Sequence, residues 1–340
     1  MAIDERKQRL IEWLTGVFST NKFSCEPASS DASFRRYFRV QFGGQSYVVM
    51  DAPPTHEDCI PFITVADVLS KHGINAPTIF HQSVEKGFLV LSDFGSDSFL
   101  DKLSDLTVDQ YYDDAVQALH KMHDISLSEV FIPRYDLSLL LQEMSLFEEW
   151  FIKKLLAVDL SVDDKKILLD VKERLAQSAL QQPQVFVHRD YHSRNLMVTN
   201  TDNPGVIDFQ DAVVGPISYD LVSLFRDCYI DWPDEKIYAW LDQFFQQRQG
   251  RGCSDHFDQA QLYQWFDWMG VQRHMKAIGI FSRLLLRDDK EGYLKDIPRT
   301  LAYVVAICAR YEELKPLAEL IGKYQLMAKF EALQLQRAAS

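Results

Sequence analysis

The sequence lacks several features that would assign a chain to a broad class of proteins. Its five cysteines include no C-x-x-C pair, so neither a zinc knuckle nor a disulfide framework is predicted. Its strongly apolar stretches, such as residues 302–309, fall far short of the ~18 residues needed to span a bilayer. The charged amino terminus has no apolar segment of the kind found in a signal peptide. We therefore expect a reduced, cytoplasmic protein that is not embedded in a membrane.

Basic residues are scarce relative to acidic ones. Lys and Arg number 36 against 49 Asp and Glu, which leaves a formal net charge of −13. Such a surface repels the phosphates of nucleic acids and anionic lipids, so it argues against a general nucleic-acid or membrane binder. A polyphosphate substrate would have to arrive with its own metal ion. The composition carries no signal for an oligomeric state.

The chain contains no internal repeat and no low-complexity tract, and its 340 residues predict two domains or lobes. Apolar spacing predicts a helix near the amino terminus, and alternation on both sides of Gly43-Gly44 predicts a β-hairpin. A helix is then expected at residues 57–72, and strands at residues 78–81 and 87–91. From residue 107 the pattern is helical, except for short strands at residues 185–187, 196–198 and 206–207. The predicted fold class is α+β, with a small antiparallel-sheet lobe at 1–92 and a large helical lobe at 93–340.

The strongest catalytic signal is H-R-D-Y-H-S-R-N at residues 188–195, followed by an Asp at position 208, after a short strand. Phosphoryl transfer depends mainly on positioning and charge neutralisation, so it needs few protein groups. One carboxylate orients and deprotonates the attacking hydroxyl, while an amide oxygen and a second carboxylate hold Mg²⁺. Asp190 would be the base, and Asn195 and Asp208 would be the metal ligands. The alternative is that these residues only form turns, but the flanking strands and the full spacing favour catalysis.

This segment resembles the catalytic and metal-binding loops of the aminoglycoside phosphotransferase and choline kinase branch of the protein-kinase-like fold. The order of a sheet-rich and then a helical part, and G-P-I-S-Y-D at residues 215–220, extend the resemblance. It implies a two-lobed small-molecule kinase that uses ATP and Mg²⁺. It also implies that His188 and Asp220 brace the catalytic loop. Asp220 could alternatively cap a helix that begins at Leu221, which is compatible with that bracing.

A second motif, D-F-G at residues 93–95, spells the metal motif of protein kinases but precedes the catalytic loop. In the order typical of the family, Ser92 and Asp93 lie at the hinge that binds the adenine of ATP. Only twelve positions separate Asp208 from Asp220, and no A-P-E follows. A peptide-docking segment does not fit in that interval, so the expected acceptor is a small molecule.

The phosphate end of the nucleotide site departs from the family pattern. The segment before the hairpin, residues 27–34, contains no glycine. Its small residues can still offer backbone N–H groups to phosphate oxygens. We expect Ser30, Ser33, Phe34 and Arg36 to bind ATP at this end.

The family usually places a phosphate-pairing Lys where this chain has Met50, whose thioether carries no charge. Arg35, Arg36 or Arg39 could supply that charge, although strand alternation sends neighbours to opposite faces. Each of them could equally be a solvated charge on an edge hairpin.

A narrower resemblance covers residues 29 to about 310. The segments S-S-D-A-S-F-R-R-Y-F, V-M-D-A-P-P and Q-R-H-M-K-A-I-G-I-F-S-R-L are similar to those of the bacterial anomeric kinases of cell-wall sugar recycling. This implies ATP-dependent phosphorylation of the anomeric hydroxyl of N-acetylmuramic acid and N-acetylglucosamine, in peptidoglycan recycling. That group also carries Met-Asp-Ala-Pro-Pro, so Met50 is compatible with activity.

The acceptor site is expected in the helical lobe. One long helix carries Arg273, His274 and Lys276 near several aromatic residues, a mixture that suits a sugar with a carboxylate. Aromatic residues at this spacing also commonly belong to the core. We expect Arg194, Arg273 and His274 to contact the acceptor.

Two alternatives remain open for the function. One is a phosphotransferase for an aminoglycoside, choline-like or other amino-bearing acceptor, which the acidic surface would favour. The other is a pseudokinase-type binding module, against which the complete set of Asp190, Asn195 and Asp208 argues.

Overall fold

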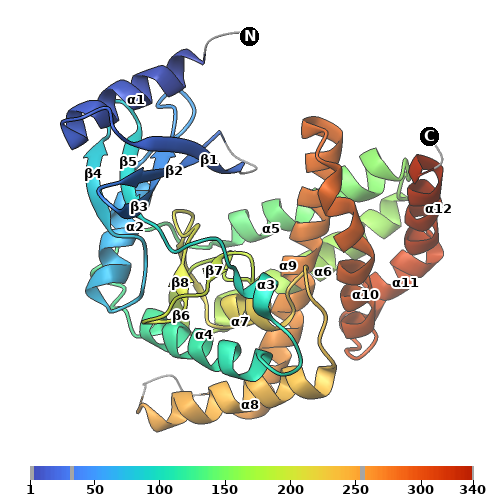
Figure 1. Cartoon of the computed structure of the whole chain (residues 1–340). Coiled ribbons are helices and arrows are strands. Elements are labelled where there is room, and N and C mark those ends of the chain that lie inside the picture. The colour runs from blue at the N-terminus through green and yellow to red at the C-terminus, as the bar shows by residue number, and fades with distance from the viewer. Residues whose placement is uncertain (1–3, 31–33, 253–256, 339–340) are drawn as a thin grey trace. The chain divides into compact units, whose positions relative to one another are not determined.

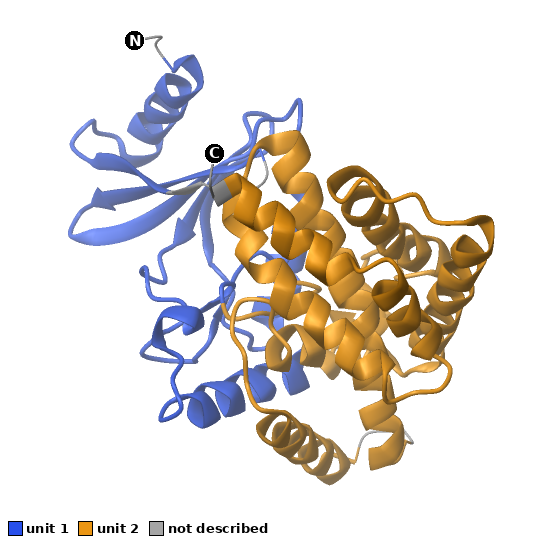
Figure 2. Ribbon diagram, turned by 90° about the vertical axis from the view of Figure 1, so that its right-hand side faces the viewer, with its two compact units in different colours: residues 1–122, 194–211 blue, residues 123–193, 212–340 orange. Residues whose placement is uncertain are grey.

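The computed structural model (Figure 1) describes residues 4–30, 34–252 and 257–338. The chain divides into two compact units (Figure 2), which are Met1–Met122 with Arg194–Asp211 (unit 1), and His123–Ser193 with Ala212–Ser340 (unit 2). The division falls within the predicted catalytic loop. Asp190 therefore belongs to unit 2, whereas Asn195 and Asp208 belong to unit 1. The lobe boundary expected after residue 92 stays a prediction.

Unit 1 is built on a five-stranded antiparallel sheet with the strand order β1-β2-β3-β5-β4. Its strands are β1 (Ser24–Ser30), β2 (Arg36–Phe42), β3 (Gln45–Asp51), β4 (Ile79–Ser83) and β5 (Phe88–Ser92). The predicted hairpin is confirmed as β2 and β3. Gly43 and Gly44 join these strands with φ of 59° and 78°, the left-handed values that a two-residue hairpin turn favours. The strands expected at 78–81 and 87–91 are confirmed as β4 and β5.

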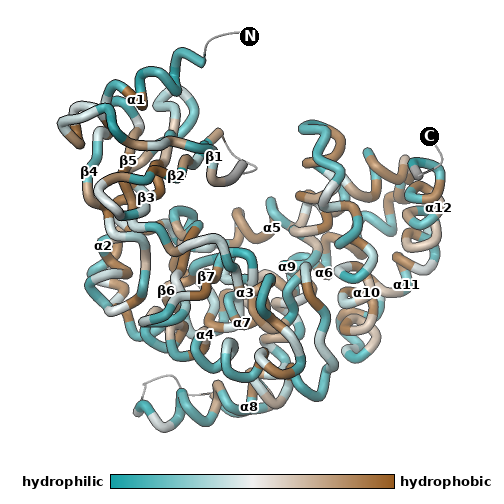
Figure 3. The backbone as a smooth tube through the Cα atoms, viewed as in Figure 1, coloured by the Kyte–Doolittle hydropathy of each residue, from teal (hydrophilic) through white to brown (hydrophobic). Residues whose placement is uncertain are grey.

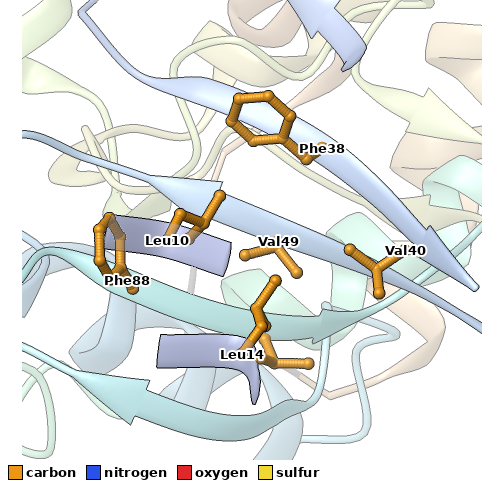
Figure 4. Close-up of a cluster of buried hydrophobic side chains, with 7 residues drawn as sticks. Leu10, Leu14, Phe38, Val40, Val49 and Phe88 are labelled. Carbon is orange, nitrogen blue, oxygen red and sulfur yellow. The ribbon is translucent and has the colours of Figure 1, made fainter. Parts of the chain in front are cut away.

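The helices of unit 1 are α1 (Glu5–Phe18), α2 (Ile60–Lys71), α3 (Phe99–Lys102) and α4 (Val108–His123), whose last residue belongs to unit 2. Helix α1 covers one face of the sheet. Figure 4 shows Leu10 and Leu14 of α1 beside Phe38, Val40 and Val49 of the sheet, and all five are buried. Burying each leucine contributes about 1.5–3 kcal/mol. This packing commits one face of β2 and β3 to the core and leaves the other face for the site.

Unit 1 also holds the hairpin of β7 (Leu196–Met197) and β8 (Gly205–Val206). Its backbone is attached to the rest of the unit, because Val206 N–H donates to the carbonyl of Asn75 at 2.8 Å. A Cβ at Gly205 would lie 2.7 Å from the ring of Phe94, so only glycine permits this approach. The hairpin carries Asn195 at one end and Asp208 two residues beyond the other.

Unit 2 is mostly helical, with one two-stranded antiparallel sheet. The sheet is β6 (Gln184–Val187) and β9 (Val213–Pro216). The helices are α5 (Leu137–Leu146), η1 (Phe147–Leu155), α6 (Val162–Gln181), α7 (Ser218–Phe225), α8 (Asp234–Gly250), α9 (Gln259–Asp288), η2 (Glu291–Asp296), α10 (Ile297–Cys308), α11 (Lys315–Lys323) and α12 (Leu326–Ala338). The nine-residue π-helix η1 was not predicted from the sequence.

Helix α9 is the centre of unit 2, and it packs against α5, η1, α7 and α10. Asp258 caps its first turn through a hydrogen bond from the N–H of Gln261. A Cβ at Gly279 would lie 2.4 Å from the carbonyl carbon of Leu146, so glycine is required at this approach. Hydrophilic and hydrophobic segments are mixed along α9 (Figure 3). No helix in the described part of the chain is long and apolar enough to cross a bilayer.

Candidate active site

A cavity of about 680 Å³ lies in unit 1, on the face of the sheet opposite to α1. The sheet contributes Tyr37, Arg39, Val48 and Leu91 to its wall. Beyond the sheet, the lining includes Ser92, Asp93, Phe94, Gly95 and Ser96 after β5, and Arg194, Asn195, Met197, Ile207 and Asp208 around the β7–β8 hairpin. The predicted hinge and the predicted metal ligands therefore line one cavity.

Hydrogen bonds hold the segment after β5 in place. Ser92 Oγ accepts a hydrogen bond from the N–H of Thr78 at 3.0 Å. The carboxylate of Asp93 accepts from Arg39 Nε at 2.7 Å and from Ser46 Oγ at 2.5 Å. Burial opposes ionisation of Asp93, but the hydrogen bonds from Arg39 and Ser46 outweigh it and lower its pKa. This carboxylate is thus bound into the wall of the cavity.

Asn195 and Asp208 lie together in the cavity wall. Asn195 Nδ2 donates to Asp208 Oδ2 at 3.2 Å, and Gln210 Nε2 donates to Asp208 Oδ1 at 2.8 Å. Asp208 has a φ of 65°, a strained backbone that is found mainly where the surrounding structure imposes it. No group of three or more His, Cys, Asp or Glu side chains with metal-binding geometry occurs among the described residues. One amide and one carboxylate suit Mg²⁺, which is commonly bound by one or two carboxylates together with substrate phosphates and waters.

The described residues among those predicted to bind the phosphates do not line the cavity. The side chain of Ser30 and all of Ser33 lie outside the described residues. Phe34 is exposed and contacts the ring of His56, with centroids 4.6 Å apart. Arg36 pairs with Asp51, and neither Arg35 nor Arg36 is among the residues that line the cavity.

Asp190 lies in unit 2, in the loop that follows β6. Asp220 of α7 accepts the backbone N–H of His188 at 2.7 Å and that of Arg189 at 3.0 Å. Within the loop, the N–H of Asp190 donates to Nδ1 of His188 at 3.2 Å. Burial raises the pKa of Asp220 to about 7 against the effect of these backbone hydrogen bonds. The contacts are those expected of residues that brace the catalytic loop.

Positive charge surrounds Asp190. Burial alone would raise its pKa, but Lys276, His192 and Arg273 lower it to about 2, so the carboxylate is ionised at neutral pH. Lys276 and Arg273 both come from α9.

The buried carboxylate of Glu143 pairs with two cations near Asp190, Arg189 and Lys276. Glu143 of α5 pairs with Arg189 and with Lys276, the latter at 3.3 Å, and accepts a hydrogen bond from the hydroxyl of Tyr135. Sequence reasoning missed Glu143 and Tyr135. The only signal for Glu143 was a single acidic residue inside the apolar run of residues 137–147.

The three residues predicted to contact the acceptor belong to different units, Arg194 to unit 1 and the other two to unit 2. Arg194 lines the cavity of unit 1. Arg273 is buried in unit 2, where its charge acts on Asp190. Burial lowers the pKa of His274 to about 3, and Nε2 lies 2.9 Å from the carbonyl of Arg226, so this ring is neutral. Consecutive side chains on a helix point about 100° apart, so His274 does not face the same neighbours as Arg273. Because His274 is neutral, Arg273 and Lys276 supply the positive charge of residues 273–276.

The chain is similar to proteins of known family and name. Residues 24–263 match the model of the phosphotransferase enzyme family. The N-acetylmuramate/N-acetylglucosamine kinase of Pseudomonas putida is 42% identical over 336 residues, which are 96% of this chain and 98% of that protein. The enzyme of the same name from Pseudomonas aeruginosa is 43% identical over 296 residues, 87% of each chain.

Solved structures share the fold. The ethanolamine kinase of Plasmodium vivax matches with a TM-score of 0.64 and 13% identity, over 89% of this chain and 87% of that chain. Aminoglycoside phosphotransferases and a choline kinase also match. The expected protein-kinase-like α+β fold is thereby confirmed.

Proposed function

The chain belongs to the phosphotransferase enzyme family, and we propose that it transfers a phosphoryl group from ATP to the anomeric hydroxyl of N-acetylmuramate and N-acetylglucosamine. It is a kinase, as its family and its relatives are. The acceptors are those named for relatives that are 42% and 43% identical over most of this chain. An activity of this kind belongs to peptidoglycan recycling, and its cytoplasmic location stays a prediction.

The cavity of unit 1 supports nucleotide binding. Backbone groups near Ser92 would bind the adenine edge, and the phosphates would extend toward Asn195 and Asp208, which line the same cavity. These two side chains would hold Mg²⁺, which, when bound, neutralises charge on the phosphates. That neutralisation also offsets the repulsion between ATP and a protein with a net charge of −13.

Asp190 supplies the base. Its pKa of about 2 keeps it ionised, so it can accept a hydrogen bond from the sugar hydroxyl and orient that oxygen for in-line attack. As the new P–O bond forms, the hydroxyl proton passes to the carboxylate and the ADP oxygen leaves. The anomeric hydroxyl is the most acidic of the sugar, which suits a base of such low pKa.

The similarity to these relatives carries the choice of acceptor, and the positive charge around Asp190 supports it. Lys276 and Arg273 of α9 both act on this carboxylate. Cationic acceptors such as aminoglycosides or choline would be repelled there. A neutral N-acetylated sugar is tolerated, and a sugar that carries a carboxylate is attracted.

The test is to incubate the protein with ATP, Mg²⁺ and a panel of amino sugars, aminoglycosides and choline. N-acetylmuramate and N-acetylglucosamine should be phosphorylated, and the products should lack a reducing end. On protonation, a glycosyl 1-phosphate loses its phosphate and the sugar forms an oxocarbenium ion that water attacks, so brief mild acid should release phosphate. In a proton-coupled phosphorus spectrum, the phosphorus should couple to the anomeric proton.

Each part of the proposal can fail separately. A reducing, acid-stable product would refute the anomeric position while leaving the kinase intact. Turnover of aminoglycosides or choline, with none of the amino sugars, would refute the acceptor.

A further inference from the structure

Arg35 lies just before β2, and Arg36 and Arg39 lie within it, where alternation decides which face of the sheet each side chain is on. Tyr37 and Arg39 line the cavity, whereas Phe38 and Val40 are buried in the core against α1. Side chains at i and i+2 share a face of a strand. Arg35 comes directly before β2 and outside the lining of the cavity, and alternation continued by two residues from Tyr37 directs it to the cavity side of the sheet.

Arg36 is directed to the opposite face. Its guanidinium donates to Asp51 at 2.6 Å and pairs with Asp4, the residue that caps α1. It lies over the ring of Phe38, 5.5 Å from the centroid. Arg36 thus fastens α1 to the sheet and is turned away from the cavity.

Arg39 also lies on the cavity face, but its guanidinium is occupied by residues 93–95 of the predicted hinge. It pairs with Asp93 at 2.7 Å, and its terminal nitrogen donates to the carbonyl of Gly95 at 2.8 Å. The four residues from Arg39 to Arg35 correspond to about 13 Å along a strand. Arg35 therefore lies at the end of this face that is remote from the hinge.

Arg35 is held in a largely buried ion pair with Glu57. Its Nε donates to Glu57 Oε2 at 3.1 Å, and only 11% of the Arg35 side chain and 14% of the Glu57 side chain are exposed. The other carboxylate oxygen of Glu57 accepts the N–H of Phe34 at 3.2 Å, which fixes the backbone next to Arg35. The negative charge of Asp208 is among the charges that raise the pKa of Arg35, against the effect of burial.

Met50 lies on the same face, directly opposite Tyr37 in the β2–β3 register. It is buried, and no charge is present at this position. Protein kinases place a lysine on this strand and hold it with a glutamate in the following helix. Here Glu57, three residues before α2, pairs with Arg35, which immediately precedes the neighbouring strand β2.

We propose that Arg35, oriented by Glu57, supplies the positive charge that binds the β- and γ-phosphates of the nucleotide in place of a lysine at position 50. The inference rests on the proposed function, because it assumes that ATP occupies the cavity. Arg35 then completes the site, with Arg39 at the hinge end and Arg35 at the phosphate end of one strand face.

The experiment measures nucleotide affinity without any acceptor, by displacement of a fluorescent ADP analogue. Adenosine, ADP and ATP are compared on the wild type and on Arg35→Met, Arg35→Lys and Arg36→Met. Arg35→Met should weaken ADP and ATP by roughly tenfold to a hundredfold, as expected for loss of charge-assisted hydrogen bonds. Adenosine has no phosphates, so its affinity should change by less than about threefold. Arg35→Lys should retain part of the affinity for ADP.

Arg36→Met is the matched control, since it removes the same charge from the adjacent residue on the opposite face. It should leave the affinity ratio of ADP to adenosine unchanged. Equal weakening of adenosine and ADP in Arg35→Met would show a structural role and overturn the inference, as would unchanged ADP binding. If the wild type binds neither ADP nor ATP, the proposed function itself fails.

Discussion

The side-chain amide of Asn195 donates a hydrogen bond to Oδ2 of Asp208 at 3.2 Å. The pairing of β7 with β8 creates this contact, because Leu196 opposes Val206 and the N–H of Ile207 donates to the carbonyl of Asn195 at 3.1 Å. Two oxygen-bearing side chains that are thirteen residues apart in the sequence are thereby fixed side by side. A slip of one residue in this hairpin would send one of them to the other face.

Asp208→Asn should weaken the response to Mg²⁺, because a neutral amide replaces a metal-binding carboxylate. We expect the Mg²⁺ concentration at half-maximal rate to rise by about tenfold or more, equivalent to roughly 1.4 kcal/mol. A Mg²⁺ titration of the initial rate measures this, with the exposed Asp211→Asn as the control. An unchanged midpoint and plateau would show that Asp208 is not a metal ligand.

Asp190→Asn should reduce kcat by about 10²- to 10⁴-fold, the usual contribution of a general base. The affinity for ATP should stay near that of the wild type, because the base contacts the acceptor. With a pKa of about 2 the wild-type carboxylate is ionised from pH 5 to 9, so its titration should cause no loss of rate in that range. The assignment is wrong if the variant keeps a tenth of the wild-type kcat.

Met50→Lys should give no large gain in activity, since Arg35 already provides the charge on this face. Position 50 is buried, so a lysine there pays a desolvation cost and its pKa falls. In the Arg35→Met background the same lysine should restore part of the ADP affinity. Steady-state kinetics and nucleotide displacement test both statements, and a large gain in the wild-type background would contradict them.

His274 should make the folded state sensitive to acid. Burial lowers its pKa to about 3 in the folded protein, whereas the unfolded chain titrates near 6.5. Below pH 6.5 the unfolded state binds more protons, so stability falls as the pH drops toward 3. Between pH 7 and pH 5 this group should cost about 2 kcal/mol of unfolding free energy.

Urea unfolding at the two pH values tests this prediction. His274→Gln should lose less stability than the wild type on acidification, by about that amount. His81→Gln, at an exposed position of β4, should behave like the wild type. The same pH dependence in His274→Gln and the wild type would show that His274 is not buried in its neutral form.

Local pattern predicted most of the elements near the site. Alternation around two glycines predicted the β2–β3 hairpin, and helical apolar spacing predicted α9. Each of these patterns is local, because the residues that form it are close together in the sequence. Strand β1 was missed, since Pro27 interrupts its pattern and the register shifts between Pro27 and Ser29. A strand of this kind is specified by its partner β2 more than by its own residues.

The sequence by itself determined the order and spacing of Asp190, Asn195 and Asp208, because the phosphoryl-transfer motif is a local pattern on one loop and one hairpin. It could not choose among Arg35, Arg36 and Arg39, since the phase of strand alternation depends on which face the core covers. Only the tertiary structure turned Arg36 to α1 and paired Arg35 with Glu57. It likewise made His274 neutral and left Lys276 charged, because burial and buried partners decide the charge of a side chain.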